Sequence, residues 1–446
     1  MSNLFLGIDC ATQGMRAVLI DETGAIHSTL SHDLAPVIRG ADGRLTQDAD
    51  SWVVAARDLL ALSRAAAGSR TIAAMAISAT SGTFILTDHA GNPVAPAAMY
   101  NDARASNPLA RAAAIINEIG AGSYLFAHTP EFVVAALSGQ PLSQVATDWS
   151  HALKTGVDLS AARWSEGAEK TAEQLQIQLP TLVAPGTLLG KSVDGGIPIY
   201  AAMTDGCTAH ISVGASAVGS AVTTLGTTLV LKIISARDIA GPGFYSHLIP
   251  QSRWLTGGAS NLGGISFTQY REQIAEWDQR AAAHGPATCV AYPLVGKGER
   301  FPIASPDIAA MYSQEPQNEI DAYRATLEGI AFAERLAYET LAEAGAALSG
   351  QLYSVGGGSR SALWNSIRAT VMQRSIQIVR NSGSDIGAAM IAAAASHGGE
   401  LAAQLDRFNS STESEVLPTS GEIEMYEDKY QRFLALVAPF QKREIR

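Results

Sequence analysis

Two acidic residues each follow an apolar run and precede small polar residues. Asp9 ends the run LFLGID and is followed by CATQG, and Asp205 follows PIYAAMT and precedes GCTAH. A carboxylate in such a place can bind a divalent metal, since Mg²⁺ prefers oxygen ligands. It can also accept the proton of an attacking hydroxyl group. A third interpretation of Asp205 is structural, as the N-cap of a following helix.

Three loops rich in glycine, threonine and serine each follow an apolar strand, at residues 9–14, 225–228 (LGTT) and 356–359 (GGGS). Small residues in such turns allow successive backbone N–H groups to face one concavity, which is a binding site for phosphate oxygens. Threonine hydroxyls add further donors. Each loop alone is best interpreted as an ordinary turn. Three of them in one chain favour a nucleotide.

These residues need strands that bring them to one place. Residues 4–9 and 15–21 predict a β-hairpin, and a third strand is expected over 25–32. Residues 50–67 have apolar positions at helical spacing and predict an amphipathic helix. The runs RTIAAMAIS and TFILTD predict two further strands. Strands, then a helix, then strands again favour a mixed α/β domain.

The second half of the chain repeats this order. AVTTLGTTLVLKII predicts strand, Thr/Gly loop and strand, and residues 319–345 predict a long helix with Asn318 as its N-cap. QLYSVGGG predicts a strand that ends in a glycine loop, followed by the helix SALWNSIRATVMQRS. Two halves with the same beginning predict two related domains, with a boundary near residue 214.

The composition limits the class of protein. The chain has 446 residues, 47 % of them hydrophobic and 16 % charged, with a net charge of −11. A length of this kind suits two domains, and an acidic balance argues against a nucleic-acid partner. We see no signal peptide and no apolar run long enough for a membrane, which predicts a cytoplasmic protein without a membrane partner. Three widely spaced cysteines indicate neither a disulfide framework nor a zinc site.

Eight motifs together resemble the FGGY family of carbohydrate kinases, within the actin-like ATPase superfamily. In chain order they are GIDCATQGMRAVLID, AISATSGTFILTDHAGNPVAPAAMYNDARA, TDWSHALKTG, MTDGCTAHISVG, TTLGTTLVL, LTGGASNLGG, GERFPIASP and VGGGSRSALWNSIRATVMQRSIQIV. The resemblance covers residues 4 to about 397. It implies an α/β chain with two ribonuclease-H-like domains that face a central cleft, a sugar-binding domain over 1–213 and a nucleotide-binding domain over 214–446. It also implies ATP, Mg²⁺ and a small-molecule sugar as ligands, and a monomer or homodimer.

The resemblance also implies roles for residues at matching positions. Asp205 matches the base that takes the proton from the sugar hydroxyl, and Asp9 matches the acid that places metal and phosphates. Both are candidate metal ligands and, with Thr80 and Ser81, candidate sugar-binding residues. Trp364 has a second interpretation, as a core aromatic of its helix. The candidate nucleotide-binding residues are Thr12, Gln13, Arg16, Gly226, Thr227, Gly264, Gly357, Gly358, Ser361 and Trp364.

The expected substrate comes from the residues before Gly82. Glycerol kinases resemble one another in having Arg-Glu there, and xylulose kinases in having Met-His, whereas this chain has Thr80-Ser81. Small hydroxyl groups suit a neutral polyol. Several longer runs resemble the small D-ribulose kinases of cyanobacteria and plant chloroplasts, so D-ribulose is the expected substrate. D-xylulose, L-ribulose or another polyol is the alternative. Asp102 and Asp148 are weaker sugar-site candidates, for which a structural loop role is favoured.

Two further questions remain open in the sequence. Ala11 stands where the family usually has glycine, which would strain the loop if that residue needs a positive φ and be harmless if it does not.

An actin-like ATPase without sugar transfer is the alternative function of another class, although no peptide-binding domain follows the ATPase core. A sugar-sensing protein without catalysis is a third, but it would need no base such as Asp205.

Overall fold

The computed structural model describes residues 3–250, 253–408 and 412–441. The chain divides into two compact units. The first consists of Met1–Gly214, Leu248–Gln251 and Gly383–Asn409, and the second of the remaining segments. The segment from 383 to 409 thus differs from the expected division, which assigned everything after residue 213 to the second domain. The assignment of sugar and nucleotide binding to separate domains stays a prediction.

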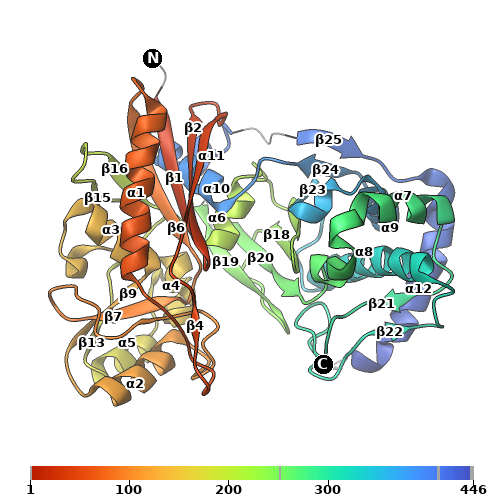
Figure 1. Ribbon diagram of the computed structural model, residues 1–446, viewed down its shortest axis with the longest axis horizontal. Helices are drawn as coiled ribbons and strands as arrows, with labels where there is room; N and C mark the ends of the chain where they lie inside the picture. The colour runs from red at the N-terminus through yellow and green to blue at the C-terminus, as the bar shows by residue number, and fades with distance from the viewer. Residues whose placement is uncertain (1–2, 251–252, 409–411, 442–446) are drawn as a thin grey trace. The chain divides into compact units, whose positions relative to one another are not determined.

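The first unit is built around a mixed sheet whose central strand is β1 (Figure 1). β1, β6 and β16 are parallel, whereas β2 pairs antiparallel with both β1 and β3. The expected hairpin and third strand are therefore confirmed. The strand order is β15 (Leu188–Lys191), β16 (Pro198–Ala201), β6 (Ile72–Ala79), β1 (Leu4–Cys10), β2 (Gly14–Asp21) and β3 (Ile26–Asp33).

Both faces of β1 are covered, which explains why the whole strand is apolar until Asp9. Leu4, Leu6 and Ile8 pack in one hydrophobic cluster with residues of α1 (Asp50–Ala67) and α3 (Thr129–Ser138). The alternate residues face α10 (Ser384–Ser396), which packs on β1 and β6 together with α6 (Asp205–Ile211). Side chains alternate along a strand, so Asp9 lies on the face of α10. The helix predicted over residues 50–67 is confirmed.

Helix α10 approaches its neighbours so closely that glycine is required at two contacts. A Cβ atom at Gly7 of β1 would lie 1.9 Å from the backbone oxygen of Asp385. A Cβ atom at Gly387 of α10 would lie 1.8 Å from the backbone oxygen of Thr208 in α6. Since α6 begins at Asp205, the packing of α10 helps to fix the backbone that carries this acid.

Gly387→Ala is expected to destabilise the protein by about 1–3 kcal/mol, because the added methyl group can be accommodated only by separating two helix backbones. Gly167→Ala in α5 (Glu166–Gln174) is a matched control, since a Cβ atom there meets nothing within 4 Å. That control should be neutral or stabilising by up to about 1 kcal/mol. Urea unfolding compares the two variants, and equal stabilities would show that α10 and α6 are not in close contact.

A second sheet in the first unit carries the connecting segments. The helices α2 (Pro108–Ile119) and α5 pack on it through a separate hydrophobic cluster. The short strand β10 (Thr147–Asp148) leads into α4 (Trp149–Gly156). The strand order of this sheet is β13 (Ile177–Gln178), β9 (Tyr124–His128), β7 (Phe84–Thr87), β8 (Ala97–Ala98), β5 (Leu45–Gln47) and β4 (Ile38–Arg39).

The main sheet of the second unit repeats the topology of the first. β17 pairs antiparallel with β18 and parallel with β23, which is parallel to β24. β17 therefore has one antiparallel and one parallel neighbour, as β1 does. The strand order is β19 (Phe244–Ile249), β20 (Arg253–Ser260), β18 (Leu229–Ser235), β17 (Ala221–Leu225), β23 (Leu352–Val355), β24 (Ile376–Val379) and β25 (Thr412–Val416).

Helices α8 (Glu319–Glu343), α9 (Ala362–Met372) and α12 (Ile423–Val437) contribute to the hydrophobic core of the second unit (Figure 1). The predicted N-cap is confirmed, because Asn318 accepts the backbone N–H of Asp321 at 3.0 Å. Within the described residues, no helix has both the length and the apolar character needed to span a membrane.

Candidate active site

The predicted acids lie at one edge of the first sheet. Asp9 is the penultimate residue of β1, Thr80 follows β6 directly, and Asp205 comes shortly after β16. The carboxyl ends of parallel strands meet at the same edge, which is where α/β sheets bind ligands. The hydroxyl of Thr80 donates to Asp205 Oδ2 at 3.0 Å. Two of the residues selected from the sequence are therefore in direct contact.

Asp205 is half-buried, and its two carboxylate oxygens differ in the number of hydrogen bonds that they accept. Oδ1 accepts the Gly206 N–H at 2.7 Å and lies 3.2 Å from the Thr204 hydroxyl. Oδ2 accepts only from Thr80 among the described residues. A carboxylate oxygen has about two acceptor positions, so Oδ2 retains one for a substrate hydroxyl. Asp205 is the first residue of α6 and Thr204 the N-cap, so the N-cap interpretation of Asp205 is wrong.

Asp9 is a buried acid with one unsatisfied oxygen. Its Oδ2 accepts from the Arg16 guanidinium at 2.8 Å, and its Oδ1 has no partner among the described residues. Burial raises the pKa of Asp9 from 3.8 to about 6; Arg16 opposes this rise, and the charges of Asp205 and Asp385 add to it. A buried acceptor without a donor is suited to a cation, since Mg²⁺ takes one or two carboxylates and fills its shell with water and phosphate. The described residues contain no cluster of three His, Cys, Asp or Glu side chains that could hold a metal alone.

The loop between β1 and β2 answers the question about Ala11. Ala11 is not among the described non-glycine residues with positive φ, so alanine causes no backbone strain there. Its N–H closes the hairpin by donating to the Gly14 carbonyl at 3.1 Å. The N–H groups of Thr12 and Gln13 have no acceptor in the described part of the chain. The Gln47 amide donates to the Thr12 carbonyl at 2.9 Å and so holds this loop in place.

A small pocket opens beside this loop, within the first unit. Its lining includes both the end of β1 and the residue after β6, and none of the lining side chains is charged. Hydroxyl and amide groups are neutral hydrogen-bond donors and acceptors, so this wall suits a single hydroxyl group of a neutral ligand, and neither Asp205 nor Ser81 is part of the lining. The polar lining residues are Thr12, Gln47, Thr80, Thr83 and Thr129.

In the second unit, the predicted glycine loops contact one another. The Gly264 N–H donates to the Gly226 carbonyl at 2.8 Å, which joins the loop after β20 to the loop after β17. A Cβ atom at Gly356 would lie 2.7 Å from the Leu225 backbone oxygen, so the loop after β23 is equally close. Gly357 differs, because a Cβ atom there meets nothing within 4 Å and the position opens into space. Thr227 is exposed at the tip of its loop.

Two family models match the chain. The N-terminal domain of the FGGY family of carbohydrate kinases matches residues 4–121, and the C-terminal domain of the same family matches residues 221–396. Together they cover more than half of the sequence. The chain belongs to the FGGY family of carbohydrate kinases.

Similar proteins agree with this family. A xylulose kinase from Streptomyces coelicolor is 24 % identical over 91 % of both chains, and a gluconokinase from Bacillus subtilis is 21 % identical over 85 % of this chain and 84 % of its own. The solved structure of a xyloylose kinase from Brucella ovis superposes with a TM-score of 0.87, at 22 % identity, over 98 % of this chain and 99 % of its own. The chain is thus an ATP-dependent sugar phosphotransferase with the two-domain, ribonuclease-H-like fold of FGGY kinases, and the fold prediction is confirmed.

Two predicted nucleotide-site residues of this FGGY kinase have structural roles. Ser361 is the N-cap of α9 and accepts the Trp364 N–H at 3.0 Å. Trp364 is 3 % exposed, donates its indole N–H to the Leu327 carbonyl at 3.1 Å and packs edge-on against Phe267. Of its two interpretations, the structure supports the core aromatic. The ring also occupies the space beside Gly358, where a Cβ atom would lie 2.6 Å from it.

Both weaker acid candidates have structural roles, Asp102 in a loop as expected and Asp148 at the end of the short strand β10 instead of in a loop. Asp102 accepts the Leu45 N–H at 3.1 Å and forms an ion pair with Arg104 at 2.8 Å. Asp148 is the N-cap of α4 and accepts the Ser150 N–H at 2.8 Å. Sequence reasoning missed Gln47, Thr204 and His151, whose contacts join segments distant in sequence. The TDWSHALKTG motif was the available signal for His151.

Proposed function

We propose that this FGGY kinase transfers the γ-phosphate of ATP to the terminal hydroxyl of a ketopentose, with D-ribulose 5-phosphate formed from D-ribulose. The observation that carries the proposal is the contact between Thr80 and the Asp205 carboxylate beside an uncharged, hydroxyl-lined pocket. A base and a polyol-binding surface then belong to the same edge of the first sheet.

Asp205 is proposed as the base. As the sugar oxygen attacks the γ-phosphorus, its proton passes to Oδ2, the oxygen with an acceptor position left. Thr80 and Gly206 fix the carboxylate plane by hydrogen bonds to its two oxygens. Catalysis of phosphoryl transfer consists largely of positioning and of neutralising charge, so a fixed carboxylate is the main requirement on this side of the reaction.

Asp9 is proposed to place the phosphates. The free Oδ1 fits a magnesium ion, which would neutralise negative charge on the phosphate oxygens. The N–H groups of Thr12 and Gln13 would donate to those oxygens, and the Thr12 hydroxyl adds a further donor. Arg16 keeps the carboxylate oriented through Oδ2.

In the second unit, Gly226, Thr227 and Gly264 are proposed to bind the nucleotide phosphates, and Gly357 and Gly358 to lie under the adenosine. The support is the convergence of the three loops and the open space at Gly357. Ser361 and Trp364 would act indirectly, by capping and packing the helix that begins beside these glycines.

Ribulose is proposed because the residues at the end of β6 are small. Thr80 offers a hydroxyl, and Ser81 is almost fully buried, with its N–H bound to the Thr204 hydroxyl at 3.1 Å. No bulky or charged side chain occupies these two positions, which leaves room for a neutral ketose. D-xylulose and L-ribulose present the same functional groups with other stereochemistry and are the alternatives.

Lys154 favours a second candidate, a sugar acid. Its ammonium group donates to the Ser81 carbonyl at 3.1 Å, and no carboxylate of the described residues lies within ion-pair distance of it. Burial lowers the pKa of Lys154, and the charge of Asp205 partly offsets this effect. A cation close to the sugar-binding residues would suit the carboxylate of an aldonic acid, and gluconokinases are among the relatives of this chain.

A coupled ADP-release assay over a panel of substrates tests the proposal. The panel contains D-ribulose, L-ribulose, D-xylulose, glycerol and D-gluconate, each at several concentrations with MgATP. The proposal requires the highest kcat/KM with D-ribulose. A preference for gluconate would establish the sugar-acid candidate instead, and ATP hydrolysis that no sugar stimulates would support the actin-like ATPase.

A further inference from the structure

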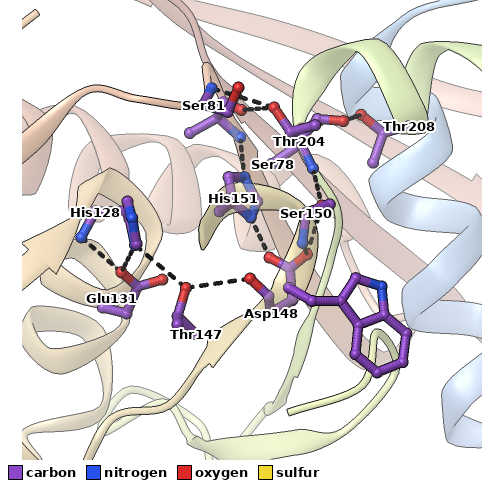
Figure 2. A network of polar contacts seen from close by, with 12 residues as sticks. Ser78, Ser81, His128, Glu131, Thr147, Asp148, Ser150, His151, Thr204 and Thr208 are labelled. Atoms are coloured by element: carbon purple, nitrogen blue, oxygen red, sulfur yellow. Dashed lines mark hydrogen bonds and ion pairs between the residues drawn. The ribbon is translucent and has the colours of Figure 1, made fainter. Parts of the chain in front are cut away.

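The segment from Asp148 to His151 contacts both strands that carry the proposed sugar site (Figure 2). The Ser150 hydroxyl accepts the Thr204 N–H at 2.9 Å, next to Asp205. The His151 ring accepts the Ala79 N–H through Nε2 at 3.1 Å, next to Thr80. Two adjacent side chains of α4 therefore bind backbone N–H groups, one just before Asp205 and the other just before Thr80. Asp205 and Thr80 are the two residues that contact one another in the site.

Asp148 orients both of these side chains. Its Oδ1 accepts the hydroxyl of Ser150, and its Oδ2 accepts from His151 Nδ1 (Figure 2). Asp148, Ser150 and His151 are each no more than 3 % exposed, so water does not compete for these bonds. Asp148 has only donors around its carboxylate, namely the Ser150 N–H, the Ser150 hydroxyl and His151 Nδ1, so it acts as an acceptor in this network.

The hydrogen atoms in this network have a single arrangement. The backbone N–H groups of Thr204 and Ala79 can only donate, so Ser150 Oγ and His151 Nε2 must accept there. The one hydroxyl proton of Ser150 then points to Asp148, and the one proton of a neutral His151 lies on Nδ1 and also points to Asp148. Since each of these donors has an acceptor, the network resists rotation of either side chain.

A third bond joins the two strands directly. The Thr204 hydroxyl accepts the Ser81 N–H at 3.1 Å and lies 3.0 Å from the Ala79 carbonyl oxygen. The two strand ends are thus joined by direct contacts, which include the Thr80–Asp205 hydrogen bond, and are held in addition by the two side chains of α4. Loss of one α4 side chain would remove this additional support from one strand end and leave it on the other.

We propose that Asp148, Ser150 and His151 are positioning residues that fix the separation between Thr80 and the Asp205 carboxylate. This inference rests on the proposed role of Asp205 as base. Ser150 holds the backbone of the base, whereas His151 holds the backbone of the sugar-binding residues. Changes at the two positions should therefore affect different kinetic constants.

The first test is the pair Ser150→Ala and Ser150→Thr. Alanine leaves the buried Thr204 N–H without an acceptor, so the base can move, and kcat should fall by about 10–100-fold with sugar KM changed less than about threefold. Threonine retains the hydroxyl and should keep kcat within about threefold of the wild type. A folded Ser150→Ala enzyme with wild-type kcat would overturn the inference.

The second test is the pair His151→Asn and His151→Gln. The Gln side chain reaches the place of Nε2 and can still accept the Ala79 N–H, whereas Asn reaches only the place of Nδ1. We expect sugar KM to rise about tenfold in His151→Asn and less than about threefold in His151→Gln. Equal effects of the two variants would show that the segment has only a structural role. The same conclusion would follow if kcat fell and KM rose together in proportion to a fall in the melting temperature.

These measurements use whichever sugar the wild-type enzyme phosphorylates best, so they do not depend on D-ribulose. Amide hydrogen exchange supplies a readout that needs no sugar. Ser150→Ala should accelerate exchange at Thr204 but not at Ala79, and His151→Asn should do the reverse. An enzyme without sugar activity but with this exchange pattern would refute the proposed function and leave the network intact, whereas unchanged exchange in both variants would refute the network.

Discussion

Asp205→Asn is expected to lower kcat for sugar phosphorylation by about 10²–10⁴-fold, the range typical of a lost general base. Asparagine has the same shape, and its carbonyl oxygen can still accept the Gly206 N–H in place of Oδ1. At the position of Oδ2, however, an amide nitrogen cannot take a proton from the substrate. The hydroxyl of Thr80, which donates there in the wild type, can turn and accept from that amide.

The variant should therefore remain folded. The free energy of unfolding, measured by thermal denaturation, is expected to change by no more than about 1 kcal/mol. The hydrogen bond from Thr80 is lost, but a hydrogen bond of opposite direction replaces it. ATP binding, measured by calorimetry, should be unchanged within about threefold. The exposed Asp194 provides the control, because Asp194→Asn makes the same chemical change on the surface. Retention of more than a tenth of the wild-type kcat in Asp205→Asn would remove Asp205 from the role of base.

Substitutions of Thr80 distinguish the contribution of the Asp205 base from the contribution of its hydrogen-bond partner. Thr80→Ser keeps the hydroxyl that donates to Asp205, whereas Thr80→Val replaces it by a methyl group of similar size. The loss in kcat should be confined to valine and should be much smaller than that of Asp205→Asn, since valine changes the orientation of the carboxylate and not its ability to accept a proton. A comparable loss in both threonine variants would instead indicate that packing at this position controls the rate.

The sequence predicted those parts of the molecule that depend on neighbouring residues. The hairpin of β1 and β2, the helix from Asp50 to Ala67 and the Asn318 cap all follow from local periodicity, turn residues and capping preference. The acids at strand ends could also be selected, because strand direction brings them to one edge. None of these features requires knowledge of distant contacts.

Features that depend on long-range contacts could not be predicted. Residues 384–396 are rich in alanine, and only the close approach at Gly7 and Gly387 shows that the helix they form belongs to the first unit. Nothing in the local sequence indicates that His151 accepts the Ala79 N–H. The role of Trp364 depended equally on a contact with Phe267, nearly a hundred residues earlier.

Asp9→Asn is expected to make the protein more stable at pH 8 and much less active. Burial of a charged carboxylate with one unsatisfied oxygen destabilises the folded state, which is why the pKa of Asp9 is raised to about 6. A rise of about two pKa units corresponds to a cost of up to about 3 kcal/mol when the group is ionised. Asparagine carries no charge and avoids this cost. Loss of the Arg16 contact matters little, since that side chain is half exposed.

The sign of the pH dependence follows from the raised pKa. Below the unfolded value near 4, Asp9 is protonated in both states and the substitution has no electrostatic effect. As the pH rises through 6, the folded state must release a proton that it binds more tightly than the unfolded state does, so wild-type stability falls relative to Asp9→Asn. The advantage of the variant should be largest at pH 8 and about half as large at pH 5.

Asp21, at the far end of the same hairpin, is a control of opposite sign. Burial slightly opposes ionisation there, but the hydroxyl and N–H of Thr23 and the N–H of Ala25 hold the pKa of Asp21 below its usual value. Its stabilising contribution is therefore present above pH 4 and lost as the pH falls. Asp21→Asn should be less stable than the wild type at pH 8 and equal to it at low pH.

Urea unfolding in the presence of a chelator measures both variants without the contribution of a bound cation. Activity of Asp9→Asn, measured with the best sugar of the panel, should fall by at least about 10²-fold, because the carboxylate that would hold the metal and phosphates has lost its charge. A gain in stability together with a loss of activity is the expected result for an acid kept for function at a structural cost. A variant less stable than the wild type at pH 8 would mean that Oδ1 of Asp9 is satisfied in solution and that the acid stabilises the hairpin.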